Sequence, residues 1–240
     1  MIKNLLLFLT VFASPNKEIR NTVSYDSLYE KDLYRFANRG LKESYLSSVF
    51  VFSTNEIEVE SMGSGNYFSY KGKRFVLTAA HVVVGHENIF VGGKGEEVSQ
   101  AFPVFINKEK DIAILKLEKE LTFTKAIPFK KDEDKKIGKK VYHTGHPDGQ
   151  SWHVSEGLLA STGDEFLILN TFAWPGSSGS VILDERGRAI GVVSSIRISN
   201  PMGLPDMIEH IVAISNIDNI SIYELNRALC VNWFYFLGGG

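Results

Sequence analysis

The sequence predicts an all-β protein, and three features of its 240 residues support this. Short apolar or alternating runs recur between turn residues at a spacing of about 8–12 residues, in two sets around a charged connector. Helical periodicity is confined to the two ends of the chain, so helices do not alternate with strands as a parallel sheet requires. Val, Ile, Phe and Thr are frequent, and Gly outnumbers Pro by 21 to 7. We therefore expect a barrel or sandwich of antiparallel strands.

Composition and charge exclude several classes of protein. Hydrophobic residues make up 44% of the chain and charged residues 22%, values typical of a globular protein. The net charge of −2 gives no electrostatic reason to expect nucleic acid or an anionic membrane as a partner. The single cysteine, Cys230, excludes an internal disulfide and a Cys-rich zinc site, and we expect it to be a small buried hydrophobe.

The N-terminus has the pattern of an export signal. Lys3 precedes nine apolar or small residues, Leu5–Ala13, in which Val11 and Ala13 suit the −3 and −1 positions of a signal peptidase site. That run is about half as long as a membrane-spanning helix, so we expect no stable span. Cleavage would remove residues 1–13 and place the protein in the periplasm or outside the cell. If the run is instead a buried strand, the protein is cytoplasmic.

The elements follow in order from this point. Residues 14–45 form an N-terminal helical segment, in which Tyr25–Arg39 is amphipathic and Gly40 suits a C-terminal cap. The first set of strands occupies Leu46–Ser53, Tyr67–Tyr70, Arg74–Thr78, Ala101–Ile106 and Asp111–Leu117. The lysine-rich run Phe123–Lys140 carries charges of both signs, which favours a solvated connector over a binding patch.

A second set of strands and a C-terminal helix complete the chain. The strands are expected at Val141–Thr144, Trp152–Ser155, Glu165–Leu169, Ser180–Leu183, Ala189–Ile196 and Ile208–Ile214. Asp218–Leu229 has the pattern of a short helix. The aromatic run Trp233–Leu237 is expected to pack against the strands rather than contact a membrane.

Three segments carry residues suited to acyl transfer. His81 lies in LTAAHVV, Asp111 heads the strand DIAILKL, and Ser178 lies in GSSGS. Acyl transfer needs a nucleophile, a base that takes its proton, and a group that holds the base in the right tautomer. Glycine beside the serine allows a tight turn and lets backbone N–H groups point at a developing oxyanion. Each segment alone is weak, but the three together predict a nucleophilic serine enzyme.

These segments resemble the trypsin/chymotrypsin family of serine proteases, and most closely its disulfide-free bacterial type, represented by HtrA proteases and glutamyl endopeptidases. TAAH at 78–81, DIAIL at 111–115 and GSSGS at 176–180 resemble the family's three motifs. Supporting similarities are GSG at 63–65, TGHP at 144–147, VSEGLLAS at 154–161 and GVVS at 191–194. The resemblance covers about residues 47–216.

The resemblance implies two six-stranded antiparallel β-barrels of chymotrypsin-like fold, with short N- and C-terminal helices. The first barrel would occupy residues 46–122 and the second residues 138–216. A connector at 123–137 would join them, and a C-terminal helix and tail would occupy 217–240.

The resemblance also implies a serine endopeptidase that works without metal or cofactor on a protein or peptide substrate. Ser178 would be the nucleophile, His81 the acid–base and Asp111 the orienting carboxylate. The backbone N–H groups of Gly176 and Ser178 would form the oxyanion hole. Two alternatives stay open: a catalytically silent binding module with the protease fold, and a protease that processes a virus or phage precursor. The sequence gives no indication of the oligomeric state.

The same resemblance indicates the substrate pocket. Phe172 and Ala173 precede the nucleophile, and Phe172 stands where trypsin has its acid, so an Arg or Lys P1 side chain would find no partner. Ser194, Ser195 and Ile196 would pair with the substrate backbone, and Ile196 would narrow the pocket. We therefore expect small or aliphatic P1 residues. His210 would accept an acidic P1 side chain if it pointed inward, but an exposed histidine at a strand end is the simpler interpretation.

A metal site is not expected. His143 and His146 form an HxxH pair with Asp148 nearby. The turn that contains Gly145 and Pro147 does not place both imidazoles on one face, and the chain has no HExxH helix.

Overall fold

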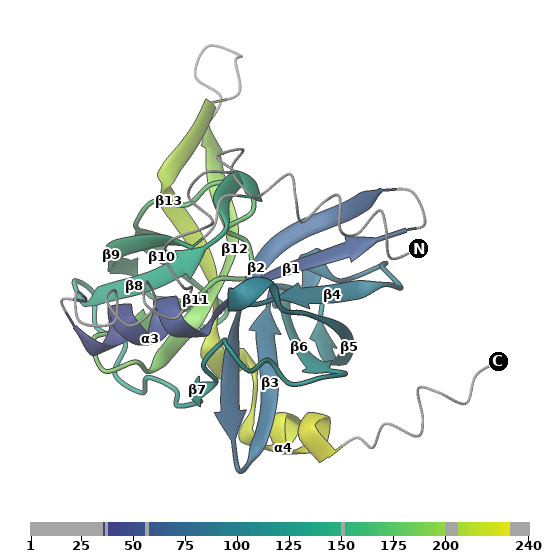
Figure 1. Ribbon diagram of the computed structural model, residues 1–240. Helices are drawn as coiled ribbons and strands as arrows, with labels where there is room; N and C mark the ends of the chain where they lie inside the picture. The colour runs from purple at the N-terminus through teal and green to yellow at the C-terminus, as the bar shows by residue number, and fades with distance from the viewer. Residues whose placement is uncertain (1–35, 37, 56–57, 150–151, 200–205, 231–240) are drawn as a thin grey trace, which may run out of the picture.

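The computed structural model describes residues 36, 38–55, 58–149, 152–199 and 206–230. Two six-stranded antiparallel barrels form the molecule, which confirms the predicted fold class (Figure 1). In the first, the strand order is β1-β4-β5-β6-β3-β2, and pairing of β1 with β2 closes the ring. Its strands are β1 (Ser48–Thr54), β2 (Val59–Tyr70), β3 (Lys73–Thr78), β4 (Ile89–Gly92), β5 (Val98–Asn107) and β6 (Ile112–Leu117).

The second barrel closes in the order β10-β13-β12-β11-β8-β9. Its strands are β8 (Lys140–Gly145), β9 (His153–Ser161), β10 (Phe166–Asn170), β11 (Val181–Asp184), β12 (Ala189–Ser199) and β13 (Asp206–Asn216). The hairpin of β12 and β13 extends well beyond the barrel (Figure 1).

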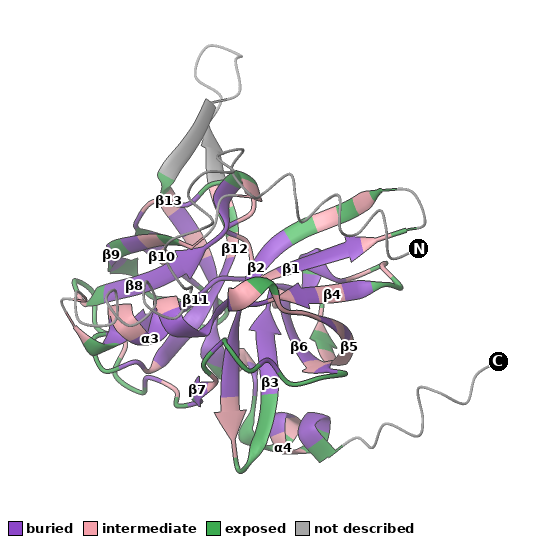
Figure 2. Ribbon diagram, in the orientation of Figure 1, coloured by how far each residue is buried: buried purple, intermediate pink, exposed green. Residues whose placement is uncertain are grey.

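Each barrel has its own apolar core, shown as buried segments in Figure 2. The core of the first barrel continues onto Val181 and Val192 of the second barrel, so the two barrels pack directly together. The middle of β2, from Gly63 to Phe68, is buried on both faces, although the start of the strand alternates. This continuous burial is typical of a strand covered on its outer face as well as inside the barrel.

Two strands of the first half were not predicted. β4 has only four residues, and the runs on either side of it were assigned to longer strands. β7 (Ile127–Pro128) lies in the connector and pairs in parallel with β2 through Phe68. Strands this short carry too few residues for an alternating pattern to stand out.

A helix lies where the sequence predicted a C-terminal cap and the start of a strand. α3 runs over Arg39–Ser47, so the assignment of Gly40 as a C-terminal cap and of Leu46 to a strand is wrong. Asn38 caps the N-terminus of α3, because its Oδ1 accepts a hydrogen bond of 2.9 Å from the Leu41 N–H. The leader Leu5–Ala13, most of the predicted helix Tyr25–Arg39 and the run Trp233–Leu237 lie outside the described residues.

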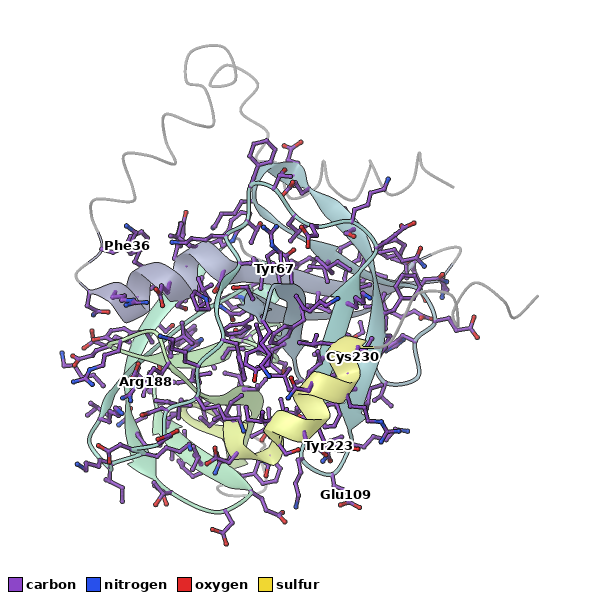
Figure 3. The ribbon with its side chains drawn as sticks, turned by 90° about the horizontal axis from the view of Figure 1, so that it is seen from below. Phe36, Tyr67, Glu109, Arg188, Tyr223 and Cys230 are labelled. Carbon is purple, nitrogen blue, oxygen red and sulfur yellow. The ribbon has the colours of Figure 1, made fainter. Side chains whose placement is uncertain are left out.

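The C-terminal helix α4 (Ile222–Cys230) packs on the first barrel (Figure 1). It buries Leu225, Ala228 and Leu229. Cys230, at its end, is exposed, so the prediction that it is buried is wrong (Figure 3). It lies four residues after Asn226 and therefore extends the outer face of the helix. In the described part of the chain, no helix is long and apolar enough to cross a membrane.

The lysine-rich connector is not fully solvated, contrary to the prediction. Asp132 is completely buried and forms ion pairs with Lys139 and Arg188. The Nη2 of Arg188 lies 2.9 Å from Asp132 Oδ1. Arg188 also pairs with Asp184 at 2.7 Å. Burial of Asp132 is possible because two cations compensate two carboxylates in this cluster. The cluster fixes the connector to the turn between β11 and β12.

Candidate active site

His81 lies in a single turn of 3₁₀ helix, Ala80–Val82, that follows the end of β3. Its backbone N–H donates to Asp111 Oδ1 at 2.9 Å, and its ring Nδ1 lies 2.8 Å from Asp111 Oδ2. Because a carboxylate only accepts, the Nδ1 carries the proton and Nε2 is directed away from Asp111. Nearly half of the His81 side chain, 48%, is exposed, so the free edge of the ring can be reached by a substrate.

Asp111 occupies the turn before β6, with a left-handed φ of 49°. Burial opposes ionisation of its carboxyl, but hydrogen bonds from His81 and Ser194 outweigh this and hold its pKa below the usual range. The Ser194 hydroxyl donates a hydrogen bond of 2.5 Å to Asp111 Oδ2. Ser194 lies at a register irregularity of β12, between Val193 and Ser195. Sequence reasoning assigned Ser194 to substrate binding and missed this contact, for which the sequence carries no local signal.

The loop that carries Asp111 is attached to the second barrel. The carbonyl of Lys110 accepts a hydrogen bond from the Ser215 hydroxyl, and the Lys110 ammonium pairs with Glu165. Both partners belong to the region of β10 and β13. The carboxylate of the first barrel is therefore held in place by residues of the second.

Ser178 lies in the loop between β10 and β11, and it is half-buried. Its carbonyl accepts a hydrogen bond of 2.6 Å from the backbone N–H of Ser64 in β2. The next residue, Gly179, has a φ of 90°, and a Cβ there would lie 2.0 Å from the Ser64 carbonyl oxygen. Only glycine fits this close approach of the loop to the first barrel.

The turn of His81 and the loop of Ser178 both pack against Gly63 of β2. A Cβ built on Gly63 would lie 2.7 Å from Val82 Cγ2 and 2.9 Å from the Ser178 carbonyl oxygen. Residues separated by about a hundred positions in the sequence thus come together between the barrels. In the region that the structure describes, neither Ser178 Oγ nor His81 Nε2 makes a hydrogen bond.

The loop before Ser178 leaves two backbone donors available. The Pro175 carbonyl accepts from the Asp148 N–H at 2.7 Å, and the Ser177 carbonyl accepts from the Ser180 N–H at 3.0 Å. Across the described residues, no acceptor is bonded to the N–H of Gly176 or of Ser178. Two such N–H groups flanking a nucleophile are what an oxyanion hole requires.

The residues predicted to form the substrate pocket differ in how far they are buried. Ala173 is buried, Phe172 is half-buried, and its ring centroid lies 5.2 Å from that of His153. Ile196 is partly buried and packs against the core of the second barrel. Ser195 and His210 are exposed.

The two histidines of the HxxH pair contact different partners. His143 Nε2 donates to the Phe172 carbonyl at 3.0 Å, whereas His146 Nε2 lies 3.3 Å from the Ser48 hydroxyl. The His146 ring also packs edge-on against Phe50 at 5.4 Å. The described residues contain no group of three His, Cys, Asp or Glu side chains arranged to hold a metal ion.

His143 makes the stability of the second barrel sensitive to acid. Burial lowers the pKa of its imidazole from 6.5 to about 4. His143 therefore binds a proton near pH 6.5 in the unfolded chain but only near pH 4 in the folded chain. The contribution of neutral His143 to the free energy of unfolding is complete above pH 6.5 and is lost as the pH falls towards 4.

We expect His143→Gln, which keeps a donor for the Phe172 carbonyl, to remove this part of the pH dependence. Between pH 6.5 and 4, the free energy of unfolding should fall by roughly 3 kcal/mol more in the wild type than in the variant. Denaturant unfolding at a series of pH values measures this. The exposed His210→Gln is the matched control and should behave as the wild type. Parallel curves for wild type and His143→Gln would contradict the prediction.

Asn66 of β2 joins three elements behind the loop of Ser178. Its Oδ1 accepts from the Val181 N–H at 2.9 Å, and its Nδ2 donates to Ser47 Oγ at 2.8 Å and to the Ser44 carbonyl at 3.3 Å. The side chain is fully buried. It thus ties the end of α3 to the start of β11, three residues after Ser178, a function that no sequence motif indicated.

A known family model matches the segment that carries His81, Asp111 and Ser178. The family model described as "Trypsin-like peptidase domain" matches residues 63–192, which is more than half of the chain. The chain is 32% identical over 170 residues to a "Probable periplasmic serine endoprotease DegP-like" of Pseudomonas putida, covering 65% of this chain and 34% of that protein. It is 26% identical over 157 residues to "Protease Do-like 1, chloroplastic" of Arabidopsis thaliana, covering 60% of this chain and 36% of that protein. The chain thus spans about a third of the length of these curated relatives.

Solved structures share the fold. A serine endoprotease from Yersinia pestis superimposes with a TM-score of 0.62 at 22% identity, covering 82% of this chain and 64% of that one. The HtrA-type protease AlgW with tripeptide superimposes with the same TM-score at 23% identity, covering 75% of this chain and 59% of that one. With the family match over the motif-bearing segment, these similarities confirm the resemblance predicted from the sequence. The chain belongs to the trypsin-like peptidase family.

Proposed function

We propose that this protein is a serine endopeptidase that hydrolyses peptide bonds through an acyl-enzyme. The observation that carries the proposal is the hydrogen-bonded pair of His81 and Asp111, which lies beside the loop of Ser178 at the junction of the barrels. Relatives in the same family are named serine endoproteases, which supports the same activity.

The proposed reaction has two steps. Ser178 Oγ attacks the substrate carbonyl while His81 Nε2 takes its proton, and the N–H groups of Gly176 and Ser178 stabilise the oxyanion. The C–N bond then breaks, the amine leaves with the proton from His81, and an ester to Ser178 remains. Water, deprotonated by His81, hydrolyses the ester, releases the acid and restores the serine. Substrate binding would align Oγ with Nε2, since catalytic hydrogen bonds often tighten only in the complex.

The proposal includes a preference for small or aliphatic P1 residues. The position where trypsin carries an acid is Phe172, whose ring lies against His153, and Ile196 packs against the core of the second barrel. An apolar side chain at this position gives a cationic P1 residue no partner. The exposed position of His210 supports the view that it does not receive an acidic P1 side chain.

A peptide library tests both statements. We expect the wild-type protein to cleave it, with Ala, Val or Leu enriched at P1, and a fluorophosphonate to block all cleavage. A profile dominated by Arg, Lys or Glu would contradict the proposed pocket but not the activity. Folded protein that cleaves nothing and does not react with the fluorophosphonate would contradict the activity and favour a binding module with the protease fold.

The proposal also places the protein in the periplasm or outside the cell. The Pseudomonas relative is named periplasmic, and Leu5–Ala13 has the pattern of a leader. A mature chain that begins at Ser14 would agree with this, and one that retains Met1 would contradict it.

A further inference from the structure

Ser64, in the GSG segment of β2, contacts the loop of Ser178 twice. It is fully buried, and its N–H donates to the Ser178 carbonyl at 2.6 Å. Its hydroxyl donates to the Gly176 carbonyl at 2.7 Å. The two carbonyls belong to the same two residues whose N–H groups have no acceptor in the described structure. Ser64 therefore binds both of the residues that carry these donors.

The hydrogen-bond network fixes the direction of the Ser64 hydroxyl. Its oxygen accepts from the His146 N–H at 2.9 Å, and the Ser64 carbonyl accepts from Thr78 Oγ1 at 2.7 Å. A hydroxyl has a single hydrogen, and here the Gly176 carbonyl is its acceptor. All polar groups of Ser64 are thus engaged, and the residue joins β2, β3, the end of β8 and the loop of Ser178.

This network matters because Gly176, as a glycine, does little to hold its own conformation. Its φ is 96°, in a region that glycine reaches freely but does not prefer over the alternatives. Rotation about Gly176 would turn the donors of the loop away from a common point. The hydrogen bond from Ser64 Oγ selects one orientation of the Gly176 carbonyl. Asp148, through its N–H to the Pro175 carbonyl, holds the preceding peptide.

We propose that Ser64 is a positioning residue that holds the Gly176–Ser178 loop so that its two free N–H groups converge on the oxyanion of the transition state. The inference rests on the proposed serine endopeptidase function and deepens it. Such a contribution acts on the transition state rather than on ground-state binding, because the oxyanion forms only during the reaction.

The test is Ser64→Ala in the full chain, which removes the hydroxyl but keeps the backbone N–H to the Ser178 carbonyl. We expect kcat to fall by about 10- to 100-fold, less than the roughly 10²- to 10³-fold fall caused by removing an oxyanion donor outright. KM should change by less than about two-fold, because the change is specific to the transition state. The affinity for a peptide aldehyde, whose adduct carries the same oxyanion, should fall by the same factor as kcat/KM.

Ser53→Ala is the matched control. Ser53 is a fully buried serine of the adjacent strand β1, and its hydroxyl has no hydrogen-bond partner among the described residues. It should leave kcat within about two-fold, and circular dichroism should show both variants folded. An equal fall of kcat in Ser53→Ala would assign the effect to core packing and overturn the inference.

The other outcomes separate this inference from the proposed function. An active wild type with unchanged kcat in Ser64→Ala, or with a raised KM and unchanged kcat, would overturn the role of Ser64 and leave the endopeptidase function standing. A wild type that neither cleaves peptides nor reacts with a fluorophosphonate would overturn both.

Discussion

Replacing Ser178 or His81 by alanine should lower kcat for peptide hydrolysis by about 10⁶-fold in either case, close to the loss for the whole unit. The nucleophile and its base act together, because the serine hydroxyl is a poor nucleophile until His81 Nε2 removes its proton. The double variant should therefore lose no more than either single variant. Steady-state hydrolysis of a cleaved library peptide measures these values.

The control for Ser178→Ala is Ser180→Ala, in the same loop. The Ser180 hydroxyl is buried without a hydrogen-bond partner in the described structure, whereas its carbonyl accepts from the Val193 N–H and is unaffected by the substitution. We expect Ser180→Ala to retain wild-type kcat within a few-fold. An inactive Ser180→Ala variant together with an active Ser178→Ala variant would contradict the assignment of Ser178 as the nucleophile.

Replacing Asp111 by asparagine should lower kcat by about 10⁴-fold with little change in structure. Asp111 Oδ1 accepts the His81 backbone N–H, so the amide nitrogen of asparagine is forced into the position of Oδ2. There it donates to Nδ1 and moves the ring proton to Nε2, which can then no longer accept a proton from Ser178. Asparagine tolerates the left-handed φ of this position, so the turn should persist.

The Asp111 carboxyl is also expected to stay ionised at low pH. Because hydrogen bonds from His81 and Ser194 hold the pKa of Asp111 below the usual range, the carboxylate stays ionised and continues to orient the His81 ring as the pH falls through the usual range of an aspartate. Ser194→Ala removes only one donor to Oδ2 and should reduce kcat far less than Asp111→Asn. A fall of less than ten-fold in folded Asp111→Asn would contradict the orienting role.

Local patterns predicted most of the strands because alternation and turn residues are properties of short segments. The run Arg74–Thr78, for example, lies within β3, and Ala189–Ile196 lies within β12. The same local patterns assigned Gly40 to a C-terminal cap, because glycine at this place suits such a cap when the segment is considered in isolation. Asn38, two residues earlier, is the observed N-terminal cap. The connector was assigned to solvent because its charge pattern does not reveal that Asp132 meets Lys139 and Arg188.

The sequence by itself determined the β class, because composition and periodicity depend on sequence alone. It also determined the family and the three segments that carry His81, Asp111 and Ser178, because these are recognised from contiguous motifs. Only the tertiary structure decided which residues support them. Ser64 reaches Gly176 across 112 positions, and Ser194 reaches Asp111 across 83. Each of these contacts is made by an ordinary serine in a strand, and its partner is set by how the barrels pack. Hydrogen bonding depends on distances of a few tenths of an ångström, which a linear pattern does not encode.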